Sequence, residues 1–263
     1  MASRLSDDIH AVDSFSTDST LDVLREFGVK VTQAPFENYG RQRNDAIGSI
    51  KCRYVWQLHL DADEVLSVEL VDEILGLRED SRDDAFLIPR YLRFLGRDLK
   101  GGGMSPTWHM RLFREGSARC EERLYDQHFY LVNSGPVGSL RGAMVDCIEM
   151  NLSEWTARHN RWSDAEVAEV FVRREGELKG RIEGRLAGNK IERKRFARGF
   201  YDRAPLFLRA LGLFFYRYVL RLGFLDGREG FVFWFLQTLW FRFLIDAKVF
   251  ERAKLELASG ADK

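Results

Sequence analysis

The chain has 263 residues, and 45% of them are hydrophobic. This length and composition exclude global disorder and allow one large core, or a main domain with a smaller appendage. Lysine plus arginine and aspartate plus glutamate both total 40, so the formal charge is zero and no overall electric field attracts nucleic acid. We therefore expect no nucleic-acid partner.

The cysteines and the first residues both favour a cytoplasmic location. Cys52, Cys120 and Cys147 are widely spaced and include no CxxC pair, which argues against a disulfide framework or a zinc knuckle and favours a reducing compartment. The opening MASRLSDDIH contains acids and no apolar h-region, which is unlike a secretory signal. We expect the chain to stay on the cytoplasmic side of the membrane.

The first sixty residues alternate between strand and helix patterns. The sequence predicts a strand at IHAV, an acidic turn at DSFSTDST, a helix at LDVLREFG that ends at Gly28, and a strand at VKVTQAPF. It predicts a further helix at RQRNDAIGSI and a strand over residues 54–60, whose nearly continuous apolar character favours a buried parallel position. This alternation predicts a wound α/β sheet.

Beyond Leu60 the pattern becomes β-rich and then helical. SVELVDEILGL has helical spacing with Ser67 as its cap, and AFLIP is typical of a strand. The middle third consists of short segments joined by glycine turns, and from Ser153 the pattern is helical and later basic. We therefore predict an α/β domain over residues 1–150 and a helical region over residues 151–263.

Two aromatic segments of the last third have the length of a membrane span. They cover residues 206–225 and 231–250, but arginine, aspartate and lysine interrupt both of them, so neither offers the roughly 18 uninterrupted apolar residues that a spanning helix needs. Apolar faces flanked by arginine favour helices that lie in the interface of an anionic membrane. The alternative is that they are core helices or the seam of a homodimer.

Three acids crowd the end of an apolar strand in WQLHLDADEVL. Asp61 and Asp63 are two residues apart, and in extended backbone such residues project to the same side. We therefore expect both carboxylates to face one divalent cation that prefers oxygen, Mg or Mn, with positions left for phosphate oxygens. Alternatively, the two aspartates are surface residues and Glu64 only interacts with a helix dipole.

A second acidic turn follows the first strand. Asp13 ends that strand, and Ser14, Ser16 and Thr17 supply hydroxyl groups after it. Because ligands of open α/β sheets bind beyond the carboxyl ends of the strands, the two acidic turns are expected to flank one crevice. One turn would hold a ribose or base, and the other a metal-bound diphosphate.

Several of these motifs together resemble a known family. VDSFSTDST, the QRN at residues 42–44 and LDADE are similar to the family 2 glycosyltransferases of GT-A fold, a Rossmann-like wound mixed sheet. More narrowly, they resemble the bacterial branch that builds lipopolysaccharide core and exopolysaccharide. The similarity continues through WHMRLFREG, RLYDQHF, ARHNRWSD and YRYVLRLGFLDGREGFVFWFLQ, so it covers almost the whole chain.

The resemblance implies an inverting, metal-dependent transferase that uses a nucleotide-activated sugar. It places Asp13, with the neighbouring Ser14, against the nucleotide and Arg43 near its phosphate or base, and it matches Asp61 and Asp63 to the DxD motif that binds metal and donor. The alternatives are that Asp13 caps a helix and that Arg43 is a solvated helix charge.

Inversion also needs a base that removes the proton of the acceptor hydroxyl. The family supplies a carboxylate from the region after the central strands, where this chain has Glu121, Glu122 and Asp126. We favour Asp126, ahead of Glu122, because Tyr125 and Phe129 would partly desolvate it and His128 is near. All three acids can also be loop charges.

The segment after the flexible GGG of residues 101–103 contains Trp108 and His109. Aromatic faces bind the C–H surfaces of sugars, so these two residues are candidates for a loop that faces the acceptor. The alternative for Trp108 is a buried strand tryptophan. We interpret His59, inside an apolar strand, as structural and His159 as a helix-surface or packing residue.

The chain departs from the family pattern at its start. Family members begin with an additional strand and helix before the segment equivalent to IHAVDSFSTD, so we expect this chain to lack the first β-α unit and to be N-terminally truncated. Loss of an inner parallel strand would leave backbone groups unpaired and an apolar sheet edge exposed.

Three functions follow from these patterns. The first is a peripheral membrane glycosyltransferase that moves a sugar from a nucleotide donor to a lipid-linked or lipid A-anchored saccharide, on the cytoplasmic face of the bacterial inner membrane. The second is a sugar-phosphate nucleotidyltransferase, which would normally show a glycine-rich basic loop near its N-terminus. The third is a catalytically incomplete protein that binds anionic lipid through its basic C-terminal helices.

Overall fold

The chain forms two compact units. The computed structural model describes residues 2–123, 126–174, 184–188 and 190–261. The first unit comprises Met1–Arg90 and Trp108–Asp146, and the second comprises Tyr91–Thr107 and Cys147–Lys263. The predicted division at residue 150 lies close to the last passage between the units. The predicted division did not foresee that residues 91–107 belong to the second unit.

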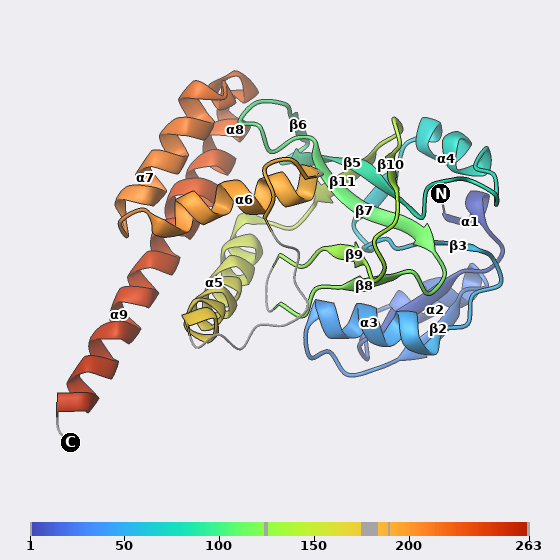
Figure 1. Cartoon of the computed structure of the whole chain (residues 1–263), viewed down its shortest axis with the longest axis horizontal. Helices are drawn as coiled ribbons and strands as arrows, with labels where there is room; N and C mark the ends of the chain where they lie inside the picture. The colour runs from blue at the N-terminus through green and yellow to red at the C-terminus, as the bar shows by residue number, and fades with distance from the viewer. Residues whose placement is uncertain (1, 124–125, 175–183, 189, 262–263) are drawn as a thin grey trace. The chain divides into compact units, whose positions relative to one another are not determined.

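The chain begins with a β-α-β unit, as predicted (Figure 1). A short helix, α1 (Ala2–Leu5), precedes β1 (His10–Asp13), α2 (Thr20–Glu26) and β2 (Lys30–Gln33). The two strands are parallel, with His10 opposite Lys30 and Asp13 opposite Gln33. Gly28 has a φ of 66°, a left-handed conformation in which glycine ends a helix without steric cost.

The remaining strands form one mixed sheet and a separate hairpin. They are β3 (Trp56–Leu58), β4 (Glu64–Leu66), β5 (Ala85–Phe94), β6 (Arg97–Leu99), β7 (Thr107–Arg114), β8 (Ala118–Cys120), β9 (Phe129–Leu131), β10 (Val137–Ser139) and β11 (Met144–Ile148). The order in the sheet is β3-β7-β5-β11-β4, with β6 and β10 also paired to β5, and β8 pairs with β9.

The strand direction at β3 corrects one prediction. We expected a parallel strand over residues 54–60, but β3 is shorter and pairs antiparallel with β7, Gln57 lying opposite Phe113. A nearly continuous apolar run indicates burial on both faces, and it says nothing about the direction of the neighbouring strand. The unit has an α/β fold with a mixed sheet, as predicted, but the pairing of β3 is antiparallel.

Helix α4 (Val68–Leu75) closes the core of the first unit. The Ser67 side chain caps it by accepting a hydrogen bond from the Leu70 amide, as predicted. Leu70 and Val71 are fully buried and pack in a cluster with side chains of the sheet. A β-carbon at Gly142 would lie 2.2 Å from the Leu70 Cα, so a glycine is needed where this helix approaches the chain.

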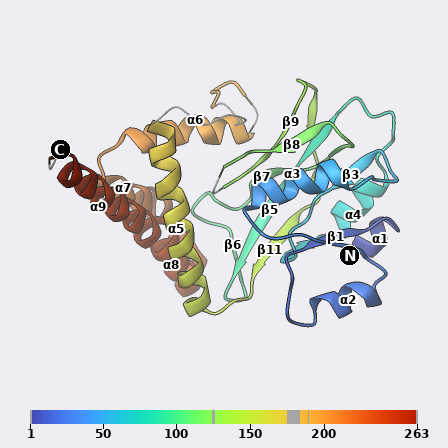
Figure 2. The same ribbon diagram turned by 90° about the horizontal axis from the view of Figure 1, so that it is seen from below.

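The second unit consists mainly of helices (Figure 2). They are α5 (Leu152–Arg174), α6 (Lys190–Arg203), α7 (Leu208–Phe215), η1 (Tyr216–Leu220), η2 (Gly223–Asp226), α8 (Gly227–Trp234), η3 (Phe235–Trp240) and α9 (Phe241–Ala261). Their core joins Phe94 and Leu99 to Trp155 and Trp234. His159 is 3% exposed, which confirms the packing interpretation of that residue.

The loop of three glycines is packed against these helices. The buried Asp226 carboxylate accepts hydrogen bonds from the amides of Lys100 and Gly101 and from the Trp234 indole. A β-carbon at Gly102 would lie 2.2 Å from the Trp234 ring. The expectation of a flexible GGG segment is therefore wrong, because its glycines allow close packing in the second unit rather than motion.

Within the described part of the chain, no helix has both the length and the hydropathy required to cross a bilayer.

Candidate active site

Three consecutive side chains of α3 (Tyr39–Ser49) hold three separate segments of the first unit. Gln42 Nε2 donates to Ser14 Oγ at 2.8 Å, and Arg43 Nη2 lies 2.6 Å from Asp61 Oδ1. The Asn44 side chain exchanges two hydrogen bonds with the backbone of Cys120. Successive helical residues point about 100° apart, so one short stretch contacts both acidic turns and the β8–β9 hairpin.

The start of α3 fits tightly against that hairpin. The Asn38 side chain caps the helix by accepting a hydrogen bond from the Arg41 amide at 2.9 Å. Gly40 is buried, and a β-carbon there would lie 2.4 Å from the Glu121 carbonyl oxygen. Glycine at this position therefore lets the helix come close enough for Asn44 to reach Cys120.

Asp61 lies between two arginines. Its Oδ1 contacts Arg43 and its Oδ2 contacts Arg111 Nη2, both at 2.6 Å. Burial would raise the pKa of the Asp61 carboxyl, but the charges of Arg111 and Arg43 hold it well below its ordinary value. Both oxygens of this carboxylate are therefore occupied by guanidinium groups.

The charge network continues from Arg111 along the sheet. Arg111 is 4% exposed, and it also contacts Glu64 Oε1 at 2.8 Å. Burial disfavours its charge, yet Asp61 and Glu64 raise its pKa above the ordinary value. Arg90 then bridges Glu64, at 3.7 Å, and Asp146, at 3.4 Å. Three arginines and three acids thus alternate from Arg43 to Asp146.

Asp63 differs from Asp61 in its surroundings. It is exposed, and it makes no hydrogen bond or ion pair with any residue whose position the structure describes. Both aspartates lie in the turn between β3 and β4 rather than in extended backbone, so the expected projection of both side chains to one side does not apply. Of these two aspartates, Asp63 is the one whose carboxylate is not engaged by an arginine.

This arrangement fits a cation that completes its coordination with substrate oxygens. Mg²⁺ is commonly held by one or two carboxylates together with phosphates and water, and an exposed carboxylate such as that of Asp63 is compatible with this kind of site. Among the described residues, no group of three His, Cys, Asp or Glu side chains forms an all-protein metal site. The metal role of Asp61 and Asp63 stays a prediction.

The turn after β1 is held by Asp13. Asp13 is 5% exposed, and its carboxylate accepts hydrogen bonds from the Ser16 amide and from Gln33 Nε2. Hydrogen bonds from Ser16 and Gln33 lower the pKa of Asp13. Asp13 thus shapes the turn rather than capping α2, whose first residue is Thr20. Its neighbour Ser14 is exposed and contacts Gln42.

The three candidate bases on the β8–β9 hairpin have different surroundings. Glu121 is fully buried, and its carboxylate accepts a hydrogen bond from the His128 amide at 3.0 Å. Glu122 is exposed. Asp126 is half-buried, with Oδ1 3.9 Å from His128 Nε2 and a φ of 54°. Tyr125, which was expected to desolvate Asp126, lies outside the described residues, and Phe129 packs instead against His59 and Phe113.

The two residues expected in an acceptor-facing loop belong to a strand. Trp108 and His109 lie in β7, and both are half-buried. The His109 ring contacts the His128 ring edge to face, with centroids 5.3 Å apart. The loop expectation is therefore wrong, because the alternating residues of WHMRLF continue the sheet, but His109 is brought to the same hairpin as Asp126.

The sequence patterns did not identify Arg111, Arg90 or Asp146. Burial raises the pKa of Asp146 above its ordinary value, although the nearby charge of Arg90 acts to lower it. The available signal was an arginine directly between the apolar residues Met110 and Leu112 within a strand. A buried charge is costly unless it is paired, so this arginine pointed to acidic partners that the sequence could not name.

Comparisons with known proteins agree with the resemblance in the sequence. Residues 3–132 match the model of Glycosyl transferase family 2. An uncharacterized glycosyltransferase of Rickettsia bellii is 37% identical over 84 residues, which is 32% of this chain and 28% of that protein. One of Rickettsia felis is 38% identical over 81 residues, again 28% of its length. The matched region thus spans less than a third of these relatives.

Among solved structures, the crystal structure of S. aureus TarS 1-349 is similar to this chain with a TM-score of 0.39 and 12% identity. The similarity covers 94% of this chain and 82% of that structure. The family match contains Ser14, Gln42, Arg43, Asp61, Asp63 and Asp126. The part of the chain that holds the candidate site is therefore similar to family 2 glycosyltransferases, which supports a role in glycosyl transfer.

Proposed function

We propose that the protein is an inverting glycosyltransferase that moves a sugar from a nucleotide donor to a lipid-linked or lipid A-anchored saccharide. The proposed setting is bacterial envelope polysaccharide synthesis at the cytoplasmic face of the inner membrane. The observation that carries the proposal is the convergence on α3, where Gln42 contacts the Ser14 turn and Arg43 contacts the turn of Asp61 and Asp63. The family match supports the transfer chemistry.

The donor would bind between the two turns. Ser14 offers an exposed hydroxyl to the nucleoside, and Asp13 keeps its turn in shape through Ser16 and Gln33. Asp61 holds the guanidinium groups of Arg43 and Arg111 in place. The positive charge of Arg43 would attract the negatively charged diphosphate of the donor. Mg or Mn, held by Asp63, would stabilise the negative charge that develops on the departing diphosphate.

Asp126 is the proposed base. In an inverting displacement, the acceptor oxygen forms a bond to the anomeric carbon while the bond to the diphosphate breaks. The hydroxyl proton would pass to the Asp126 carboxylate, whose Oδ1 lies 3.9 Å from His128 Nε2. Glu122 is the second candidate because it is exposed, whereas Glu121 is buried and bonded to the His128 amide.

The first experiment is thermal unfolding with Mg or Mn and a panel of nucleoside diphosphates, on the wild type and on Asp63→Ala. A ligand that binds only the folded state stabilises it by about 2.7 kcal/mol at one hundred times its Kd. We expect metal-dependent stabilisation by one nucleotide, and its loss in Asp63→Ala. Asp80→Ala is the matched control, because Asp80 is also an exposed turn aspartate and should leave nucleotide binding unchanged.

The products separate the enzyme classes. A glycosyltransferase releases a nucleoside diphosphate from the activated sugar, whereas a nucleotidyltransferase releases pyrophosphate. If the wild type folds but no nucleotide stabilises it with either metal, the donor site proposed here is absent. The lipid-binding protein without catalysis would then be the better description.

A further inference from the structure

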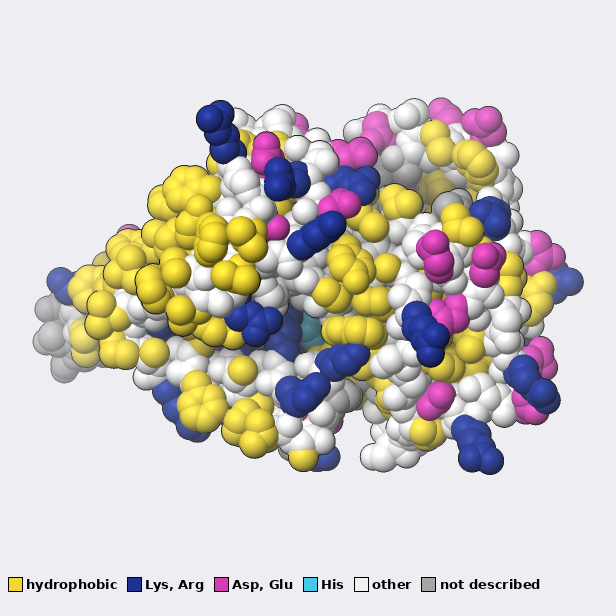
Figure 3. Space-filling model, turned by 90° about the horizontal axis from the view of Figure 1, so that it is seen from above, with side chains coloured by type: hydrophobic (Ala, Val, Ile, Leu, Met, Phe, Trp, Pro, Cys, Tyr) yellow, Lys and Arg dark blue, Asp and Glu magenta, His cyan; other side chains and the backbone are white. Residues whose placement is uncertain are grey.

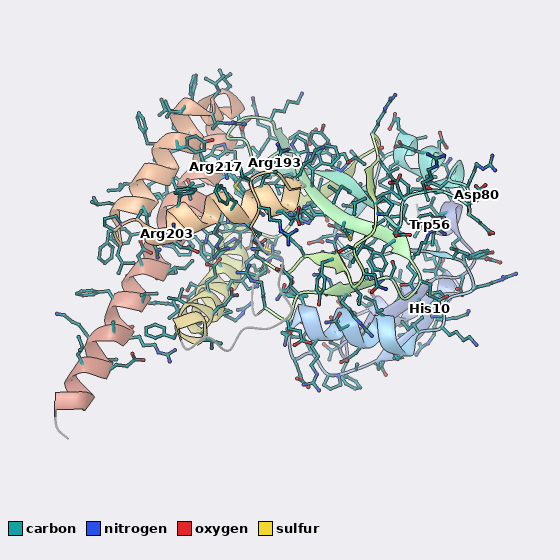
Figure 4. The ribbon with its side chains drawn as sticks, in the orientation of Figure 1. His10, Trp56, Asp80, Arg193, Arg203 and Arg217 are labelled. Carbon is teal, nitrogen blue, oxygen red and sulfur yellow. The ribbon has the colours of Figure 1, made fainter. Side chains whose placement is uncertain are left out.

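Four of the charged side chains that interrupt the two aromatic segments point into the second unit. Arg209 Nε donates to Asp246 Oδ1 at 2.8 Å, and Asp246 is fully buried. Arg217, labelled in Figure 4, donates to the Gly102 carbonyl at 2.8 Å, and Arg242 contacts Glu166 at 3.0 Å. These four groups contact protein partners inside the second unit rather than lying on its outer face.

The outer face of residues 208–235 is apolar. We call this segment, from α7 to the start of η3, the α7–η3 hairpin. Eleven of its large apolar side chains are at least 38% exposed, among them Leu208, Leu211, Phe215, Leu220, Leu222 and Leu225. In Figure 3 hydrophobic side chains gather over the helices of the second unit, with basic side chains between them.

The exposed apolar side chains are distributed along the whole of α7 rather than at one end of it. Leu208, Leu211 and Phe215 are spaced by three and four residues, so they share one face of the helix. The apolar residues continue through η1 and η2 to Phe231 on α8. Soluble monomers rarely expose a continuous apolar surface of this kind without a partner.

The exposed charges of the hairpin are both positive. Arg221 and Arg228 are exposed, whereas Asp226 is buried and Glu229 pairs with Arg97 at 3.6 Å. The hairpin therefore presents apolar side chains and arginine without an unpaired acid. This combination complements the acyl region and the anionic headgroups of a bilayer.

We propose that the α7–η3 hairpin is the membrane-docking surface, and that it lies in the plane of a bilayer rich in anionic lipid. Leucine and phenylalanine would enter the acyl boundary along the length of α7, and Arg221 and Arg228 would meet the headgroups. A second copy of the chain is a poorer occupant, because a symmetric dimer would place the same arginines of both copies on one small interface. The inference is independent of the sugar-transfer proposal.

The test is co-flotation of the full chain with phosphatidylcholine vesicles, with and without phosphatidylglycerol. We expect binding to the anionic vesicles and a loss of roughly tenfold or more for each substitution in the pair Leu220→Asp and Leu225→Asp. Arg221→Gln with Arg228→Gln should weaken binding about fivefold per residue on anionic vesicles only. Leu75→Asp is the matched control, because Leu75 is an exposed leucine of the first unit and should not alter binding.

The proposal is overturned if the wild type does not bind anionic vesicles, or if the double leucine variant binds them as the wild type does. It is also overturned if the wild type is a dimer that the leucine variant dissociates, without any vesicle binding, because the hairpin would then dock a second copy. Circular dichroism and light scattering on each variant show whether it is folded and how many chains associate. Nucleotide stabilisation measured on the same samples separates this result from the donor-site proposal.

Discussion

Arg111 joins two acids of one turn, and its own burial makes that connection important. Its guanidinium contacts Asp61 at 2.6 Å and Glu64 at 2.8 Å, while the Glu64 carboxylate also accepts a hydrogen bond from the Asp61 amide. The turn between β3 and β4 is therefore closed on itself and fixed to β7. Asp63 is held in the same turn without taking part in the network.

Arg111→Met should destabilise the first unit strongly. Removing one partner of a buried ion pair typically costs about 3–5 kcal/mol, and here the buried Glu64 carboxylate would keep only the more distant Arg90, at 3.7 Å, as an ion-pair partner. The arginines hold the pKa of Asp61 below its unfolded value, so their stabilisation is present above about pH 3.9 and is lost as the pH falls through the lower folded-state pKa. We expect the loss to be largest near neutral pH, as measured by chemical denaturation across a pH series.

Arg78→Met is the control for this prediction. Arg78 pairs with Asp80, but both side chains are well exposed, and solvent screens an exposed pair so that it contributes little to stability. A loss for Arg111→Met as small as that for Arg78→Met, or one that grows as the pH falls, would contradict the proposed role of the buried network.

Part of this site could be predicted from single residues. The two acidic turns were expected to flank one crevice because both follow strands of a wound sheet, and in the structure α3 contacts both of them, through Gln42 at Ser14 and Arg43 at Asp61. The engagement of Asp61 by two arginines could not be predicted, since Arg111 lies fifty residues later and its partner depends on which strands pair. The same strand pairing decides that Asp61 is engaged by arginines while Asp63 stays exposed.

At the scale of elements, the three glycines at residues 101–103 show how packing decides the meaning of a motif. In sequence, GGG is typical of a flexible loop. In the structure Gly102 N donates to the Arg221 carbonyl at 2.8 Å, and its carbonyl accepts a hydrogen bond from Arg217. The loop is a close contact with the α7–η3 hairpin, and the absence of side chains is what permits it.

Gly102→Ala should destabilise the second unit more than Gly96→Ala. Both glycines have positive φ, 64° and 77°, so each alanine carries a left-handed backbone cost of about 1–2 kcal/mol. A β-carbon at Gly102 would in addition meet the buried Trp234 ring at 2.2 Å, whereas the space at Gly96 is open. Thermal unfolding of the two variants measures the difference.

Equal losses of stability in the two variants would contradict this account, because the backbone cost alone would then explain both. A larger loss in Gly102→Ala that Trp234→Leu partly relieves would support it, since the smaller side chain opens space for the new methyl group. The pair of glycines thus separates the effect of φ from the effect of the neighbouring ring.

The elements themselves were predicted unevenly. The first β-α-β unit, α3 and α4 have strong local signals, namely a helix cap at Ser67 and a glycine stop at Gly28, and all of them are present. The predicted direction of β3 was wrong because strand pairing is a long-range property that a local apolar run does not encode. The two aromatic segments contain short π-helical turns, η1 and η3, for which we found no signal in the sequence.

For the whole molecule, the chain passes between the two units three times. Residues 91–107 contribute Phe94 and Leu99 to the core of the second unit, and the amides of Lys100 and Gly101 to the Asp226 carboxylate. The second unit is therefore built from two separate parts of the sequence. A division of the chain at residue 146 separates the helices from these contacts.

A fragment of residues 147–263 should be much less ordered than the same residues in the full chain. It lacks the amides of Lys100 and Gly101 and leaves the buried Asp226 carboxylate with only the Trp234 indole as a donor, and an under-satisfied buried charge is strongly unfavourable. It also exposes Trp234 where Gly102 covers it. Far-ultraviolet circular dichroism and amide hydrogen exchange measure the difference, with the full chain as the reference.

Protection of the Trp234 region in the fragment equal to that in the full chain would show that residues 91–107 are not required. Addition of a peptide that carries residues 91–107 offers a complementary control. If the peptide restores protection around Asp226, the contacts described here account for the instability of the fragment.

The discontinuous second unit also sets an order of events during protein synthesis. Residues 91–107 leave the ribosome well before the helices that begin at Leu152, while the first unit has all of its residues once Asp146 has emerged. Since domains generally fold as units during synthesis, Phe94 and Leu99 must wait without their core while the first unit is already complete. The nascent chain is thus most exposed to misassociation between the emergence of Asp146 and that of Trp234.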